Sequence, residues 1–322
     1  MMDLAFQTLL SPMILFFMLG LGAAFIKSDL SVPSAIAKGM SLYLMLAIGF
    51  KGGVQVSAAG FTPDLVWTGL AGFLLSLCMP VVAFFALRKT TTLPAADTAS
   101  IAGHYGPISI VTFIAATQAL KTASIPFEGY MIAVAALMEA PAIFTALRLA
   151  SRYDPETEAT PWHHILANGS VVLLAGAFVI GMITGQEGMN TLEAFVVSPF
   201  KGVLCLFLLD MGLVAGRGLM ESRHLMRGSL LAFGLYMPFL GALMAGTCAA
   251  ALSLSAGNTA LLMVCAASAS YIAAPAAMRL ALPQAKPAIS LTLAMGITFP
   301  FNLIVGIPVW VALAQAFTGG SQ

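Results

Sequence analysis

The chain has 322 residues, of which 60% are hydrophobic and only 8% are charged. Soluble domains carry about 25% charged residues, so a water-soluble globule is excluded and the protein is expected to lie in a lipid bilayer. Fourteen basic and thirteen acidic side chains leave a net charge of +1, which offers no basic face for nucleic acid. The four cysteines lie in apolar runs without metal-ligand spacing, so neither a disulfide nor a metal site is predicted.

Apolar windows bounded by charged residues, prolines and glycines predict about ten membrane-spanning helices and an all-α polytopic membrane protein. The first window has no basic residue before it, unlike a cleaved signal peptide, and is expected to be a retained span. In chain order the predicted helices cover residues 9–27, 34–53, 64–88, 97–120, 127–151, 163–185, 192–216, 225–254, 258–282 and 287–317.

The basic residues are divided unequally between the two ends of these helices. Eleven Lys and Arg residues fall on one side, whereas the other side holds only Lys51, Lys121 and Lys201. Because loops rich in Lys and Arg stay in the cytoplasm, both termini are expected outside and the polar mid-chain loop inside. The predicted location is the inner (plasma) membrane.

The two halves of the chain are similar to one another. The matched segments are 42–53 with 205–216, 120–126 with 282–287, and 139–141 with 298–300. The offset is close to half the chain length and indicates a five-helix unit used twice. Since five is odd, the second copy enters the bilayer inverted, as in many secondary transporters. The predicted units are residues 1–151, a cytoplasmic linker at 152–162, and residues 163–322.

The predicted helix 97–120 and its counterpart 258–282 are rich in small and hydroxyl residues and contain Pro107 and Pro275 near mid-span. Proline interrupts a helix, and in lipid the freed backbone groups need protein or a polar cavity. Paired interruptions indicate a binding site, where helix N-termini suit an anion and freed carbonyls suit a small cation. The alternative is that small residues and proline serve only close helix packing. The surrounding polar residues are His104, Tyr105, Ser109, Thr112, Ser268, Ser270 and Tyr271.

Two carboxylates, Glu139 and Asp210, lie inside apolar runs, where a charge costs about 2.5 to 3.5 kcal/mol on insertion scales. Glu139 is interpreted as a cation or proton ligand, the alternative being a packing acid held by hydrogen bonds. Thr298 occupies the matching position of the second half and Asn302 follows it, so Glu139, Thr298 and Asn302 are the predicted sodium ligands. Asp210 lies beside a Gly-x-x-x-Gly pattern that is typical of close packing, and its role stays open.

At these positions the chain resembles the sodium-dependent bicarbonate transporter family of the SbtA type. The matching residues are Ile48–Gly53, Gly106–Ser109 with Thr112, Met138–Ala142, Met211–Gly212, Ala267–Ser270 with Pro275 and Arg279, and Ile307–Pro308. The resemblance implies two inverted five-helix repeats, divided into a core domain with crossed broken helices and a gate domain, and assembly as a homotrimer. A PII-like regulatory partner receives no support, because the mid-chain loop is shorter than in family members with an insertion there.

The resemblance also implies that bicarbonate binds between the two interruptions, with Na⁺ as coupling ion and no further cofactor. Carried over to this sequence, the substrate residues are Gly106, Ser109, Thr112, Ser268 and Ser270, together with Tyr271 at a position where the family has an acid. The family commonly has Asp where this chain has Glu139.

These features predict a secondary transporter that takes up bicarbonate with sodium by alternating access. A monoanion entering a cell that is about 100 mV negative inside loses roughly 2.3 kcal/mol per charge, which one accompanying sodium ion cancels. One alternative is a sodium- or proton-coupled carrier of another small organic anion, and another is a receptor or scaffold that does not transport. An enzyme is not expected, because the sequence has no HExxH, phosphate loop or Gly-x-Ser-x-Gly motif.

Overall fold

A computed structural model describes residues 12–60, 62–154, 169–222, 228–271, 274–275, 278 and 282–319. Throughout these residues all regular structure is helical. The first half comprises α2 (Pro12–Phe25), α3 (Ser34–Ala59), α4 (Pro63–Thr90), α5 (Ala95–Ala102), α6 (Ile110–Thr122), α7 (Met131–Leu137) and α8 (Glu139–Tyr153). The second half comprises α10 (Gly169–Val196), α11 (Phe200–Ser222), α12 (Gly228–Ala251), α13 (Ala256–Ala267), α15 (Pro287–Leu291), α16 (Phe299–Phe301) and α17 (Ile307–Gly319), with π-helical turns η1 (Thr292–Thr298) and η2 (Asn302–Gly306).

Membrane-capable helices dominate the part of the chain that is described. Seven helical stretches are long and apolar enough to cross a bilayer. Three shorter apolar helices, α2, α6 and α13, accompany them. The prediction of an all-helical, multi-pass membrane protein is therefore confirmed.

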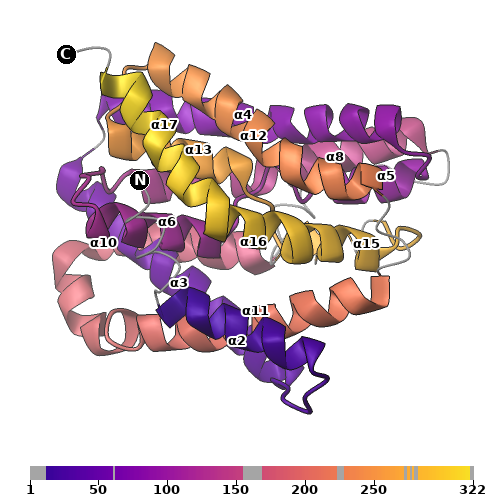
Figure 1. Cartoon of the computed structure of the whole chain (residues 1–322). Coiled ribbons are helices and arrows are strands. Elements are labelled where there is room, and N and C mark those ends of the chain that lie inside the picture. Colours follow the sequence, from indigo (N-terminus) through magenta and orange to yellow (C-terminus); the bar gives the residue numbers. More distant parts are fainter. Residues whose placement is uncertain are drawn as a thin grey trace.

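The helices are arranged in two layers (Figure 1). In the first layer α3 packs along α10 and α2 packs along α11. In the second layer α4 contacts α5, α8 and α12, while α13 contacts α12, α6 and α17. We call the group α2, α3, α10 and α11 the four-helix layer and the remaining helices the broken-helix layer.

Glycines allow very close backbone contact inside the four-helix layer. A Cβ atom at Gly53 of α3 would overlap the Phe178 carbonyl of α10. A Cβ atom at Gly212 of α11 would overlap the Phe17 carbonyl of α2. The Gly-x-x-x-Gly pattern beside Asp210 therefore packs α11 against α2, since only small residues let membrane helices approach this closely.

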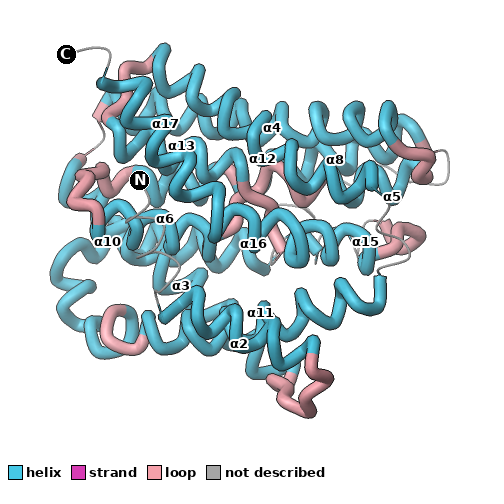
Figure 2. Tube along the Cα trace, in the orientation of Figure 1, coloured by secondary structure: helices cyan, strands magenta, loops and turns pink. Residues whose placement is uncertain are grey.

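Both helices that the sequence predicts to be interrupted are interrupted. The first is divided into α5 and α6 by a non-helical segment at 103–109, and α13 ends before Ser268, where another non-helical segment follows. Figure 2 shows these loop segments inside the molecule rather than at its ends. Arg279, in the same region, lies outside the described residues.

Several boundaries differ from the predicted ones. The helix predicted at 127–151 is divided at Met138, and the helix predicted at 287–317 contains the two π-helical turns η1 and η2. α10 runs to Val196 through a non-helical Gly185 with φ 57°. Most of the predicted linker at 152–162 lies outside the described residues, which resume at Gly169.

Candidate functional site

The two non-helical segments cross at the centre of the broken-helix layer, where two hydrogen bonds join them. The Ser109 backbone N–H donates to Ser268 Oγ at 2.9 Å. The Ser270 backbone N–H donates to the carbonyl oxygen of His104 at 2.7 Å. All four residues are buried. The crossing therefore satisfies backbone groups that interrupted helices would otherwise leave unpaired in the bilayer.

Three of the predicted substrate residues use their side chains to stabilise this crossing. Ser109 caps the N-terminus of α6, and its Oγ accepts hydrogen bonds from the Thr112 backbone N–H at 3.3 Å and from the Thr112 hydroxyl at 2.8 Å. The Ser268 hydroxyl donates to the carbonyl oxygen of Cys265 at 2.9 Å while it accepts from Ser109. Thr112 and Ser268 thus already donate their hydroxyl protons within the protein and have none left for an anionic ligand.

Gly106 has a packing role at the same interruption. Its φ of 151° is one that residues with a side chain rarely adopt. A Cβ atom there would lie 2.7 Å from Cβ of Ala142 and 2.9 Å from Cδ of Pro80. Gly106 therefore lets the non-helical segment approach α4 and α8, and it does not line the pocket described next.

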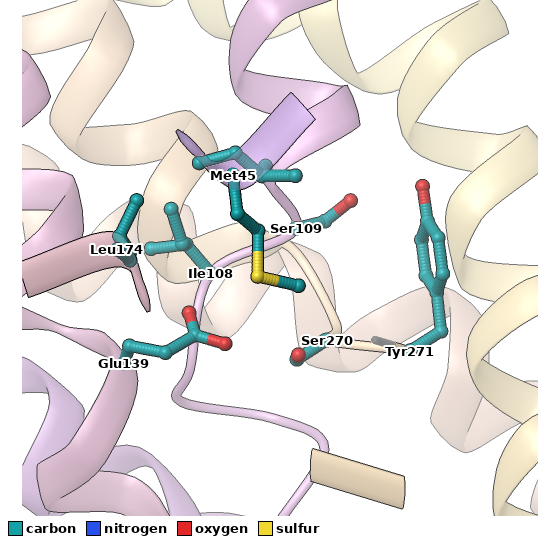
Figure 3. A pocket seen from close by; sticks show the side chains of 8 residues that line it. Met45, Ile108, Ser109, Glu139, Leu174, Ser270 and Tyr271 are labelled. Atoms are coloured by element: carbon teal, nitrogen blue, oxygen red, sulfur yellow. The ribbon is translucent and has the colours of Figure 1, made fainter. Parts of the chain in front are cut away.

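A small pocket lies beside the crossing (Figure 3). Its lining residues are Met45, Ile108, Ser109, Ile110, Glu139, Leu174, Ser270 and Tyr271. Met45 belongs to α3 and Leu174 to α10, so the pocket lies between the two layers. Its volume of about 10 Å³ is close to the minimum that holds one water molecule. In this conformation the pocket has room for a bare monatomic cation but not for a polyatomic anion.

Glu139 reaches the pocket because α4 fixes the start of α8. Pro141 has no N–H, so the helix at this point lacks one of its own hydrogen bonds. The Ser76 hydroxyl of α4 inserts there: it donates to the Met138 carbonyl oxygen at 2.5 Å and accepts from the Ala142 backbone N–H at 3.1 Å. This insertion explains the division between α7 and α8 and orients Glu139 at the first position of α8.

The Glu139 carboxylate is buried and lies next to the Ile108 backbone amide and the Ser270 hydroxyl. Figure 3 shows the Glu139 and Ser270 side chains pointing towards one another. The Tyr271 hydroxyl is turned towards the Ser109 side chain, but it forms no hydrogen bond of good geometry with a described residue. The pocket therefore combines one carboxylate, which can bind a cation, with hydroxyl groups that can donate to an anion.

The other two predicted sodium ligands, Thr298 and Asn302, do not lie with Glu139. The Thr298 hydroxyl donates to the Gly234 carbonyl oxygen at 2.9 Å and accepts from the Tyr105 hydroxyl at 2.6 Å. Thr298 and Asn302 both belong to the π-helical turns η1 and η2, whose geometry directs them towards α12 and α13.

Asn302 stabilises the C-terminal end of α13 by hydrogen bonding. Its Nδ2 donates to the Ala267 carbonyl oxygen at 2.8 Å, and its Oδ1 accepts from Trp310 Nε1 at 3.2 Å. Thr298 and Asn302 are thus bonded to neighbouring helices and do not line the pocket that contains Glu139. Among the described residues no group of three His, Cys, Asp or Glu side chains could hold a metal ion.

The sequence did not reveal three residues that shape the site. Met45 and Leu174 line the pocket from the four-helix layer, but an apolar side chain in an apolar helix carries no distinguishing signal. Ser76 is one of three hydroxyl residues in a long apolar helix, with Thr68 and Thr90. Its role depends on its hydrogen bonds to another helix, which sequence spacing does not show.

A multi-pass helical fold in which interrupted helices meet at a buried polar pocket has the architecture of a membrane transporter. A sequence profile of the Na⁺-dependent bicarbonate transporter superfamily matches residues 12–315. The chain belongs to this superfamily, and the resemblance found in its sequence is confirmed. No individual curated protein matches the chain. Membership of this superfamily implies a transmembrane transporter rather than an enzyme, with bicarbonate and sodium as the family's substrates.

Proposed function

We propose that the protein imports bicarbonate together with Na⁺ by alternating access. Membership of the superfamily supports the substrate and the ion. The observation that carries the mechanism is the pocket between the layers, which contains Glu139, Ser270 and Tyr271 but is too small for bicarbonate. A site that must enlarge to admit its substrate fits a transporter whose two layers move relative to one another.

The pocket residues have separate roles in this proposal. Ser109, Ser270 and Tyr271 donate hydroxyl hydrogen bonds to the anion, near the N-terminus of α6, where the helix dipole favours negative charge. Glu139 binds the sodium ion with the help of Ser270. The crossing is stabilised by close packing at Gly106 and by the hydrogen bonds of Thr112 and Ser268.

We further propose that residues 1–151 and 163–322 are inverted five-helix repeats. Two helix pairs support this symmetry. Gly49 and Gly53 of α3 meet the backbone of α10, and their sequence counterparts Gly212 and Gly216 of α11 meet the backbone of α2. The four-helix layer then corresponds to a gate domain and the broken-helix layer to a core domain that moves against it.

The proposed orientation has both termini outside and the mid-chain loop in the cytoplasm, as the distribution of Lys and Arg favours. A homotrimer is the proposed assembly. Ile180 and Ile183 of α10 are 55% and 76% exposed, so this helix offers an apolar face to lipid or to a neighbouring subunit. A PII-like regulator remains without support.

Uptake of labelled bicarbonate into proteoliposomes tests the proposed function. Sodium is replaced by potassium or by choline at fixed pH, and initial rates are compared. We expect uptake only with sodium, because sodium cancels the charge of the anion. Equal uptake in all three media would contradict the proposed coupling.

A sodium- or proton-coupled carrier of another small organic anion is the second candidate. Tyr271 stands where the bicarbonate transporter family has an acidic residue. Glu139 is therefore the one carboxylate among the described residues that line the pocket. A single carboxylate can take up a proton as well as a sodium ion. Uptake of a labelled organic monoanion that rises at acid pH without sodium would favour this function, whereas ligand binding without flux would indicate a receptor.

A further inference from the structure

A second, larger cavity lies at the end of the molecule where α3 and α6 finish and α11 begins. Its volume is about 820 Å³, within the range of about 300 to 1,000 Å³ that is usual for ligand pockets. Its polar lining residues are Lys51, Lys121, Lys201, Gln55, Thr117 and Gln118. The three lysines are the only basic residues that the sequence assigns to that end of the helices.

Three different helices bring these charges together. Lys51 is on α3, Lys121 on α6 and Lys201 on α11. Lys51 lies within electrostatic range of the other two lysines, and its Nζ is 4.1 Å from the centre of the Phe200 ring. No Asp or Glu is among the described residues that line the cavity. Like charges repel unless an anion lies between them, so this arrangement is suited to holding one.

The cavity lies next to the pocket at the crossing. On α3, Met45 lines the pocket and Ile48, three residues later, lines the cavity. On α6, Ile110 lines the pocket and Phe113, also three residues later, lines the cavity. Three residues of α-helix span about 4.5 Å. On both helices, therefore, less than one turn separates a residue that lines the pocket from one that lines the cavity.

We propose that this cavity is an anion vestibule, in which Lys51, Lys121 and Lys201 bind a small monovalent oxyanion before it passes to the crossing. Bicarbonate as the transported anion, and the external position of the cavity, rest on the proposed function. The binding of an oxyanion rests on the cavity itself. The neutral donors Gln55, Thr117 and Gln118 supply hydrogen bonds, while the ammonium groups raise the local anion concentration.

Initial uptake rates in proteoliposomes test the vestibule. The variants Lys51→Gln, Lys121→Gln and Lys201→Gln are expected to raise the KM for bicarbonate about threefold each, with the maximal rate nearly unchanged and a weaker dependence on ionic strength. Lys121→Arg keeps the charge and should behave like wild type. Lys38→Gln removes an exposed lysine at the opposite end and should change none of these quantities.

A second measurement does not require transport. The detergent-solubilised protein is treated with an acetylating N-hydroxysuccinimide ester, and lysine modification is quantified by mass spectrometry in sodium bicarbonate or sodium isethionate of equal ionic strength. A bound anion stabilises the ammonium form, which does not react. Bicarbonate should therefore slow the modification of Lys51, Lys121 and Lys201 severalfold, while Lys38 serves as the internal control.

The two measurements separate the vestibule from the proposed function. Protection of the three lysines in a protein that shows no sodium-dependent uptake would support the vestibule and contradict the proposed function. Sodium-dependent uptake with an unchanged KM in all three variants, and no protection by bicarbonate, would overturn the vestibule and leave the proposed function intact. Equal protection of Lys38 would also overturn it, because the effect would then be general.

Discussion

The hydroxyl groups around the crossing differ in how much hydrogen-bonding capacity they have left. Ser268 both donates and accepts within the protein, and Thr112 donates to Ser109. Ser109 only accepts in these hydrogen bonds, so its own hydroxyl proton stays available. The Tyr271 hydroxyl forms no hydrogen bond of good geometry with a described residue. This difference separates residues that bind a ligand from residues that hold the backbone, although all of them are small or polar residues near a proline.

Glu139→Gln is expected to abolish the sodium dependence of uptake while the fold persists. The amide has nearly the same shape as the carboxylate but carries no negative charge for a cation. Uptake at varied sodium concentration measures the effect, and size-exclusion chromatography checks the fold. Asp210→Asn is the matched control, since Asp210 is also buried but does not line the pocket. Normal sodium activation in Glu139→Gln would remove Glu139 from the ion site.

Ser268→Ala is expected to lower stability by about 1 to 3 kcal/mol, because the buried Ser109 N–H loses its acceptor. Thermal unfolding in detergent measures the change. Ser290→Ala is a suitable control: Ser290 is equally buried, but its hydroxyl bonds only to the carbonyl of Pro287 in its own helix. Similar unfolding temperatures for both variants would contradict a special role of the crossing.

The sequence could predict the polar residues of the site, but not which of them bind a ligand and which stabilise the backbone crossing. Small and hydroxyl residues near Pro107 and Pro275 identified Ser109, Ser268 and Ser270. The separation of Thr298 from Glu139 depends on π-helical turns, which shift side-chain directions along the last helix. No residue spacing in the sequence indicates those turns.

At the scale of helices, the interruptions follow from local chemistry together with one contact from a neighbour. Proline and glycine explain why α5 and α6 are separate. The apolar windows of the sequence predicted the positions of most helices to within a few residues. The division at Met138 was missed because it requires the Ser76 hydroxyl of α4 as well as Pro141.

Ser76→Ala is expected to weaken sodium activation as well as stability. Without the hydroxyl, the Met138 carbonyl and the Ala142 N–H lose a shared partner, so the first turn of α8 shifts and moves Glu139. The sodium concentration for half-maximal uptake should rise severalfold. Thr247→Ala, an exposed residue whose hydroxyl bonds within its own helix, is the control. A loss of stability with unchanged sodium activation would show that Ser76 does not position Glu139.

At the scale of the whole molecule, the pocket has walls from both layers, so relative movement of the layers would open and close it. Phe17 of α2 and Phe299 of α16 join the layers, with ring centres 5.2 Å apart. Tyr43 and Phe195 lie at the same ring distance but both belong to the four-helix layer. These two pairs form a matched test of the movement.

A reversible crosslink between Phe17→Cys and Phe299→Cys, in a background without the four native cysteines, is expected to stop uptake. Addition of a reductant should restore uptake, because it breaks the crosslink. The crosslinked and reduced states are thus compared within one variant. The crosslinked pair Tyr43→Cys and Phe195→Cys should transport normally. Continued uptake by the crosslinked interlayer pair would contradict movement of the layers.

The hydrogen bonds at the crossing join the two halves of the chain, since Ser109 and His104 come from one and Ser268 and Ser270 from the other. Neither interrupted helix can therefore travel without the other. A sodium ion beside Glu139 and an anion beside Ser109 would therefore move together. This coupling suppresses slippage, which is the transport of sodium without the anion. Loosening the crossing, as in Ser268→Ala, should accordingly appear as a sodium leak in bicarbonate-free vesicles, measurable with radioactive sodium.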